Sequence, residues 1–258
     1  MSVFVFMYHR TPAEAQDRFD VSLSTFKAQV DALIEAGVKI VPFDAVNDHA
    51  APRHGKYACI TFDDGHASNA PAYEHLAERG VRPASFIVRR WAETGVGEHG
   101  AGYMQAEELQ AIAPICDLGA HGVNHVCLAK IPLAEAAEEL CSSRAYLEQV
   151  LDRTVDTMAL PGGSQSPEVM ASARAAGYRL IGTSVASPHT LGGDAVNRIV
   201  VPRAARDDFL IRTVREPGVL WAAREAERSF RRSRRETLRR IRASLSAFGG
   251  RSAVAAEA

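Results

Sequence analysis

Two short groups of polar residues in this sequence have the types and the spacing needed for metal-assisted chemistry. Asp63 and Asp64 directly follow an apolar run, 57–62. His121 and His125 come later in the chain, four positions apart. Two imidazoles and one carboxylate are a sufficient set of protein ligands for a divalent cation that keeps open positions for water and substrate. The remaining aspartate is then available for proton transfer.

The same four side chains also have a plainer interpretation. The aspartates could cap a turn or orient a histidine, and the histidines could satisfy buried hydrogen bonds. An isolated pair of histidines at this spacing favours that interpretation. Adjacent aspartates at the end of a neighbouring apolar run favour a bound cation instead. Position 122 is Gly and not Glu, which excludes the His-Glu-x-x-His motif of zinc proteases.

The hydrophobic pattern predicts strands that alternate with helices as far as about Arg203. Predicted strands cover residues 3–8, 38–41, 58–62, 84–88, 116–120, 155–160, 178–183 and 198–201. Predicted helices cover the segment between Ser22 and Gly37, and residues 70–79, 106–112, 133–151 and 167–176. Such alternation indicates βαβ units and a parallel sheet. Residues 95–102 are predicted to form a glycine-rich loop.

The candidate residues fall where such a sheet would place a ligand site. His9, the aspartate pair, His121 and the turn 161–163 each follow a predicted strand. In parallel α/β barrels, the groups that bind ligands lie at the carboxyl ends of the strands. Four coincidences in four different elements therefore support one shared site. His9 itself has two interpretations, as a pocket residue or as a satisfied core histidine.

These motifs resemble those of the polysaccharide deacetylase family, the NodB-type carbohydrate esterases. The resemblance rests on Thr-Phe-Asp-Asp-Gly at 61–65 and on His-x-x-x-His at 121–125, with weaker matches at 7–10, 118–122 and 159–163. It runs from about Val3 to Arg203. It implies a distorted parallel (β/α) barrel of about seven strands over residues 1–215. The charge pattern of the remaining residues, 216–258, predicts a basic helical tail whose last residues are frayed or disordered.

The resemblance also implies a role for each residue. Asp63 would be the general base, and Asp64 would bind the cation together with His121 and His125. The backbone N–H of Gly162 would donate to the oxyanion. Zinc is the expected ion, and cobalt, nickel or iron(II) would also suit these ligands.

Three positions depart from the family pattern. The arginine that positions the base falls on Ala159, so we expect Arg198 or Arg203 to replace it, because an arginine fork suits a carboxylate. The late Leu-x-His that supplies a general acid has no clear match. His189 is the candidate for that role, with an ordinary loop histidine as the equal alternative. Gly122 stands where serine or threonine is usual.

The expected activity is the removal of N-acetyl groups from the amino sugars of a glycan or a glycan precursor. Water bound to the cation would attack the amide carbonyl while Asp63 takes its proton. Because the arginine and the acid are displaced, a catalytically impaired glycan-binding barrel is one alternative. A non-haem iron oxygenase is a weaker one, because its two histidines and one carboxylate usually lie on all-β frames.

The composition is that of an ordinary globular protein, with 47% hydrophobic residues, 24% charged residues and a net charge of −1. Nine arginines and three glutamates fall between residues 221 and 242. Residues 221–248 are predicted to form a basic amphipathic helix, which could dock on an anionic membrane surface. We expect no nucleic-acid partner.

The cysteines and the first residues of the chain bear on location. The four cysteines have no metal-binding spacing, so they are expected to be buried free thiols, which suits a reducing compartment. The apolar start is too short for a signal peptide and lacks basic residues. These features predict a cytoplasmic protein, with peripheral attachment to a membrane as a variant of that prediction.

Overall fold

The apolar run that ends in the two aspartates forms a central strand of the sheet. In the computed structural model, which describes residues 2–48, 55–163 and 165–216, β3 (Tyr57–Asp64) is buried at all 8 of its residues. It pairs in parallel with β1 (Ser2–Tyr8) on one side and with β4 (Ala84–Ile87) on the other. A strand covered on both faces is expected to be apolar throughout. Before its last two residues β3 has one exception, Thr61, whose hydroxyl donates to the Phe6 C=O at 2.9 Å.

The remaining strands extend this sheet on both sides. Their order is β10–β1–β3–β4–β7–β8–β9–β11, and β2 also pairs with β3. Apart from the antiparallel pair of β10 and β1, the pairs in this sheet are parallel. The further strands are β2 (Lys39–Ile40), β7 (Asp117–Ala120), β8 (Thr157–Ala159), β9 (Leu180–Gly182), β10 (His189–Thr190), β11 (Ala195–Val196) and β12 (Ile199–Val200).

One short segment brings the two sides of the sheet together. β11 pairs with β9, and β12, which begins three residues after β11 ends, pairs with β1. Residues 195–200 therefore connect β9 with β1, which nearly closes the sheet into a barrel. The predicted distorted parallel (β/α) barrel is confirmed, although several of its strands are only two or three residues long.

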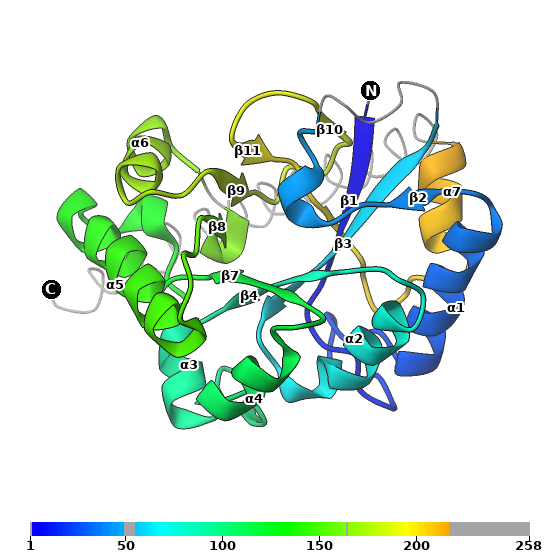
Figure 1. Ribbon diagram of the computed structural model, residues 1–258, viewed down its shortest axis with the longest axis horizontal. Coiled ribbons are helices and arrows are strands. Elements are labelled where there is room, and N and C mark those ends of the chain that lie inside the picture. Colours follow the sequence, from blue (N-terminus) through cyan, green and yellow to red (C-terminus); the bar gives the residue numbers. More distant parts are fainter. Residues whose placement is uncertain (1, 49–54, 164, 217–258) are drawn as a thin grey trace, which may run out of the picture. The chain divides into compact units, whose positions relative to one another are not determined.

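Helices surround the curved sheet in Figure 1. They are α1 (Leu23–Glu35), α2 (Ala70–Ala77), α3 (Arg89–Thr94), α4 (Ala106–Ile112), α5 (Leu133–Leu151), α6 (Pro167–Ala175) and α7 (Phe209–Arg215). The Ser22 side chain caps α1 by accepting from the Thr25 N–H at 3.2 Å. Inside the barrel, side chains of β1, β3, β4 and β8 form a continuous buried apolar cluster.

The segment predicted as a glycine-rich loop contains a short hairpin. β5 (Val96–Gly97) and β6 (Gly100–Ala101) pair antiparallel, directly after the unpredicted helix α3. A Cβ added at Gly97 would lie 2.6 Å from atoms of both the Trp91 and the Tyr103 rings. Glycine is therefore required there by close packing. Trp91 and Tyr103 are buried against each other, which agrees with a packing role.

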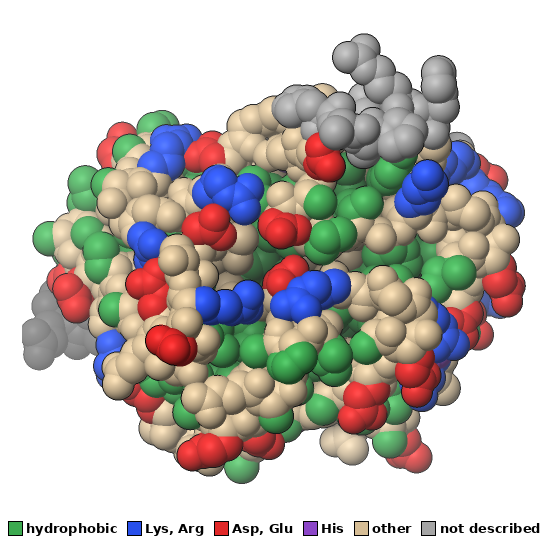
Figure 2. Space-filling model, viewed as in Figure 1, with side chains coloured by type: hydrophobic (Ala, Val, Ile, Leu, Met, Phe, Trp, Pro, Cys, Tyr) green, Lys and Arg blue, Asp and Glu red, His purple; other side chains and the backbone are tan. Residues whose placement is uncertain are grey.

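The cysteine prediction is only half right. Cys59 and Cys116 are buried, but Cys127 is half-buried and Cys141 is exposed on α5. All four are free thiols. Figure 2 shows acidic and basic side chains interspersed over one face of the molecule, as the net charge leads one to expect.

Two predictions concern the end of the chain. The predicted basic helix over 221–248, and with it the proposed membrane surface, lies outside the described residues. The predicted boundary at 215 therefore stays a prediction. Within the described residues, no helix combines the length and the apolar character that crossing a membrane would require.

Candidate metal centre

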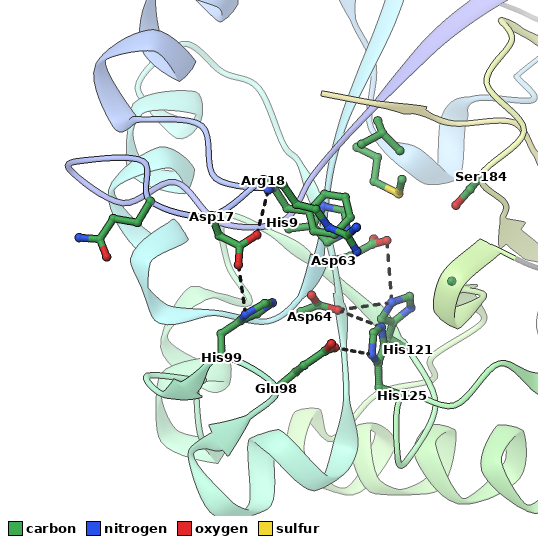
Figure 3. A pocket seen from close by; sticks show the side chains of 15 residues that line it. His9, Asp17, Arg18, Asp63, Asp64, Glu98, His99, His121, His125 and Ser184 are labelled. Atoms are coloured by element: carbon green, nitrogen blue, oxygen red, sulfur yellow. Dashed lines mark hydrogen bonds and ion pairs between the residues drawn. The ribbon is translucent and has the colours of Figure 1, made fainter. Parts of the chain in front are cut away.

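The carboxyl ends of β1, β3 and β7 surround a cavity of about 800 Å³. Asp63 and Asp64 are the last residues of β3, His9 and His121 directly follow β1 and β7, and His125 lies in the next loop. All five line the cavity, and Figure 3 shows the aspartates and the last two histidines pointing toward one another. Sites for small ligands have volumes of this order.

Asp64 occupies the centre of this group. Its Oδ1 lies 3.6 Å from the Nε2 of His121 and 3.4 Å from the Nε2 of His125. The residue is 6% exposed, and Oδ1 has no hydrogen-bond partner. Its backbone is left-handed, with φ 76°, which is uncommon for a residue other than glycine. Such a conformation, held at the mouth of a cavity, is typical of functional sites.

His121 is oriented by a backbone carbonyl. Its Nδ1–H donates to the C=O of Ala159 at 2.8 Å. Because Nδ1 carries the proton, the Nε2 of the neutral ring presents its lone pair toward the carboxylates. Burial lowers the pKa of His121 to about 3, so the ring is neutral at ordinary pH. A neutral imidazole is the form that binds metal ions.

His125 approaches Asp64 from the following loop. Its backbone is also left-handed, with φ 55°. Its Nε2 faces Asp64, and its Nδ1 lies 3.6 Å from the carboxylate of Glu98 in the hairpin. The Trp91 ring packs on the imidazole, with 4.8 Å between ring centroids. Burial lowers the pKa of His125 as well, although less of this residue is buried.

The three groups fit a divalent cation. One ligand atom from each of Asp64, His121 and His125 can be chosen so that all lie within 4.8 Å of one another. Two ligand atoms at about 2.1 Å from a tetrahedral ion are themselves about 3.4 Å apart, close to the separations found here. An unpartnered carboxylate oxygen facing two imidazole lone pairs is unfavourable unless a cation lies between them.

The electrostatics of Asp64 agree with this fit. Burial, with the adjacent Asp63 carboxylate acting in the same direction, raises the pKa of Asp64 to about 8. A carboxyl group in this position would therefore hold a proton near neutral pH unless a positive charge replaced it. A divalent ion would supply that charge.

Asp63 has a different partner, which is an arginine from the closing segment of the barrel. Arg198 donates from Nη1 and Nη2 to the two carboxylate oxygens of Asp63 at 2.6 and 2.9 Å. Arg198 is fully buried, and Asp63 is 3% exposed. Burial alone would raise the pKa of Asp63, but the Arg198 charge outweighs it and lowers that pKa to about 2. Asp63 is therefore held as an anion.

The expectation that Arg198 or Arg203 replaces the family arginine is confirmed for Arg198. Arg203 instead donates from Nη1 to the C=O of Gln16 at 2.6 Å. Ala159, where the family arginine would stand, contributes its backbone carbonyl to His121. In this chain the arginine that contacts the candidate base comes from the link between β11 and β12.

His9 is a pocket residue whose alternative interpretation as a satisfied core histidine is wrong. Its ring stacks on Phe19 with 4.5 Å between centroids, and its buried Nδ1 has no hydrogen-bond partner. Burial lowers the pKa of His9 to about 4, against the opposing charge of Asp63. The guanidinium of Arg18 lies over the Phe19 ring at 4.4 Å from its centroid, and all three residues line the cavity.

Gly162 and His189 have opposite outcomes. Gly162 lines the cavity with a left-handed φ of 65°. The structure does not bring His189 to the site, so its prediction as general acid is corrected. His189 pairs with Val3 near the amino end of β1, about 13 Å of strand before Met7, which lines the cavity. Its Nε2–H donates to the Asn47 amide oxygen at 2.8 Å.

Comparisons with known proteins agree with this geometry. The family model described as "Polysaccharide deacetylase" matches residues 50–181. A comparison with curated protein sequences found no match. Among solved structures, the chain is similar to the deacetylase PplD from Streptococcus pyogenes in complex with acetate. The two share 18% identity over 83% of this chain and 98% of that one, with a TM-score of 0.74.

Two further structures are similar over nearly their whole length. IcaB from Ammonifex degensii is 25% identical over 78% of this chain and 91% of that one, with a TM-score of 0.70. A de-N-acetylase from Aggregatibacter actinomycetemcomitans is 13% identical over 82% of this chain and 99% of that one, with a TM-score of 0.71. At the lowest identities, the likeness shows that the barrel fold is shared.

Proposed function

Because the chain belongs to the polysaccharide deacetylase family, we propose that it is a metal-dependent hydrolase that removes N-acetyl groups from amino sugars. Family membership supports carbohydrate deacetylation in general. The metal dependence and the roles of individual residues are our proposal. One observation carries it: the Asp64, His121 and His125 cluster shares a cavity with a carboxylate, Asp63, that a buried arginine holds ionised.

We assign the cation to Asp64, His121 and His125, with zinc as the preferred ion and cobalt, nickel or iron(II) as alternatives. When bound, the cation would polarise the amide carbonyl of the substrate and lower the pKa of water. Groups of the protein carry out the remaining steps.

Asp63 is the proposed general base. It takes a proton from the water molecule as the water oxygen attacks the acetyl carbonyl carbon. Its low pKa ensures that the carboxylate is available at neutral pH, and the two bonds from Arg198 fix its direction. Arg198 is therefore a positioning residue that acts through Asp63.

The tetrahedral oxyanion and the leaving amine need two further groups. The backbone at Gly162 lies in the same cavity and is the proposed N–H donor to the oxyanion. The amine nitrogen must gain a proton as the C–N bond breaks. His9 takes the role that the sequence assigned to His189, because it lines the cavity together with Asp63 and its buried Nδ1 has no hydrogen-bond partner. Since His9 is neutral, it must first receive the proton that Asp63 took from water.

The products are then acetate and a free amino sugar. A catalytically impaired glycan-binding barrel was the main alternative because the family arginine is missing and the general acid has no clear match. The contact of Arg198 with Asp63 removes the first reason, and the proposed role of His9 answers the second. The oxygenase alternative has no support from a mainly parallel barrel.

The test is acetate release from N-acetylated chitooligosaccharides by the full-length chain, before and after chelation and after zinc is restored. We expect wild type to release acetate only with the cation, and Asp63→Asn to release far less while still binding zinc. Turnover that survives thorough chelation would contradict the metal dependence. Sugar binding without any turnover would favour the impaired barrel.

A further inference from the structure

Hydrogen bonds hold the loop between His121 and His125 on both of its sides. The backbone carbonyls of Gly122 and Val123 accept from the N–H groups of Arg89 and Arg90 at 3.1 and 3.0 Å. These donors lie in the first turn of α3, where backbone N–H groups have no partner within the helix. The carbonyl side of the loop is therefore anchored to α3.

The N–H side of the loop is bound by one carboxylate, Glu139 of α5. Its Oε2 accepts from the backbone N–H groups of Val123 and Asn124 at 2.7 and 3.0 Å. Its Oε1 accepts from the Asn124 side-chain amide. Glu139 is 7% exposed, and no Lys, Arg or His pairs with it within the part of the chain that the structure describes. Both oxygens of this buried carboxylate thus accept hydrogen bonds from the loop.

Gly122 fits the same arrangement. Its φ is +75°, and a Cβ added there would lie 3.1 Å from Glu139 Oε2 and 3.4 Å from the Pro161 side chain. Another residue would be strained at this φ and would press on the carboxylate. The departure from serine or threonine at this position is therefore explained by the carboxylate that packs beside it.

We propose that Glu139 is a positioning residue of the metal centre, whose carboxylate holds the loop 121–125 with both imidazoles turned toward Asp64. This inference rests on the proposed function and deepens it. The loop contains two left-handed residues, Gly122 and His125, and such a conformation is unfavourable for a histidine. Three charge-assisted hydrogen bonds that the Glu139 carboxylate accepts offset that cost before any cation arrives.

Loss of these bonds would leave the loop to be ordered at the moment of binding, which weakens affinity. Groups that orient metal ligands without touching the ion typically contribute a factor of about 10–100 in metal affinity. Glu139 is proposed to act in this way through the backbone of the loop, since neither imidazole contacts it directly in the described structure.

The test measures zinc affinity of the metal-free full-length chain by calorimetric titration. Glu139→Ala is expected to raise the Kd for zinc by about 10–100-fold. Glu139→Gln should fall between Glu139→Ala and wild type, because one amide oxygen can still accept at the Oε2 position. Glu138→Gln is the matched control: it removes the same charge from an exposed neighbour on α5 and should leave the Kd unchanged.

A second measurement separates positioning from simple stabilisation. The visible absorption spectrum of the cobalt-loaded protein reports the geometry of the ligands, and we expect it to change in Glu139→Ala but not in Glu138→Gln. Wild-type Kd and spectrum in Glu139→Ala, with only a lower Tm of the metal-free protein, would overturn the proposal. If Glu139→Ala does not fold, a wild-type Kd for zinc and a wild-type cobalt spectrum in both Glu139→Gln and Asn124→Ala would overturn the proposal.

Failure of the metal centre itself would look different. Wild type that binds no divalent cation, or Asp64→Asn that binds zinc as tightly as wild type, would overturn the proposed function, and this inference with it. Tight zinc binding that depends on Asp64 and not on Glu139 would overturn the inference alone.

Discussion

Two buried histidines, His121 and His189, show what separates the candidate site from the rest of the core. Each is 2% exposed, and each lies within or directly after a strand of the same sheet. The Nε2 of His189 is satisfied by the Asn47 amide. The Nε2 of His121 instead faces the carboxylates of Asp63 and Asp64 at 3.8 and 3.6 Å. Two equally buried histidines therefore differ in whether the Nε2 atom is hydrogen-bonded within the fold or faces the carboxylates of the candidate site.

The difference follows from the two ends of the strands. At the carboxyl ends, side chains of adjacent parallel strands leave the core at the same level and converge on one cavity. There the Asp64 Oδ1 and the His9 Nδ1 are left without a hydrogen-bond partner, so a ligand can interact with them. At the amino end, His189 completes a neutral hydrogen bond between β10 and the residue Asn47. This second arrangement stabilises the fold, and the His189 Nε2 is already engaged by Asn47 and not free to bind a ligand.

The largest expected effect distinguishes the two histidines directly. His121→Ala removes one of three proposed ligands, so zinc bound per chain and acetate release should both fall to background. His189→Ala should keep both quantities per folded molecule, because it lies at the other end of β1. Metal content by mass spectrometry and acetate release check this pair. Full zinc occupancy in His121→Ala would contradict the role of His121 as a metal ligand.

Asp63→Asn should come next in size. An amide cannot take the proton from water, so kcat should fall by about 10²–10⁴ while zinc still binds. Asp117→Asn is the matched variant, since Asp117 opens β7 and pairs with Arg82 at 2.6 Å. Steady-state kinetics with added zinc should show no comparable loss there. Equal losses in the two variants would mean that Asp63 has only a structural role.

The two arginine–aspartate pairs should also differ in stability. Arg198→Ala leaves the buried Asp63 charge unpaired, which is expected to reduce the free energy of unfolding by about 3–5 kcal/mol. Arg82→Ala removes a partner whose side chain is 36% exposed, and the expected loss is about 1 kcal/mol or less. Urea denaturation of the metal-free variants measures both. Similar losses would show that burial does not distinguish the pairs.

The smallest effect is a pH dependence at His189. Burial lowers the pKa of His189 in the folded state, so the unfolded chain binds more protons as pH falls below about 6.5. This histidine therefore contributes stability above its ordinary pKa and loses it as pH falls, by at most about 1.4 kcal/mol per pH unit. His189→Gln should lose less stability than wild type between pH 7 and pH 5. An identical loss in urea denaturation would contradict this.

Much of the site could be predicted because its residues are local to strong patterns. An apolar run that ends in two aspartates predicts both the strand β3 and the position of Asp63 and Asp64 at its carboxyl end. The same holds for His121 after β7. The closing segment was harder, because strands of two residues such as β10, β11 and β12 have no periodicity to detect. His189 was misplaced for that reason.

The sequence by itself determined the kinds of groups and the strand ends on which they lie, since burial of a strand and its termination are written in neighbouring residues. Only the tertiary structure decided which distant residues meet them. Arg198 reaches Asp63 across 135 positions of sequence, and Glu139 reaches the histidine loop from a separate helix. Such contacts depend on how the sheet closes and how helices pack on it, and these arise from many weak interactions summed over the whole fold.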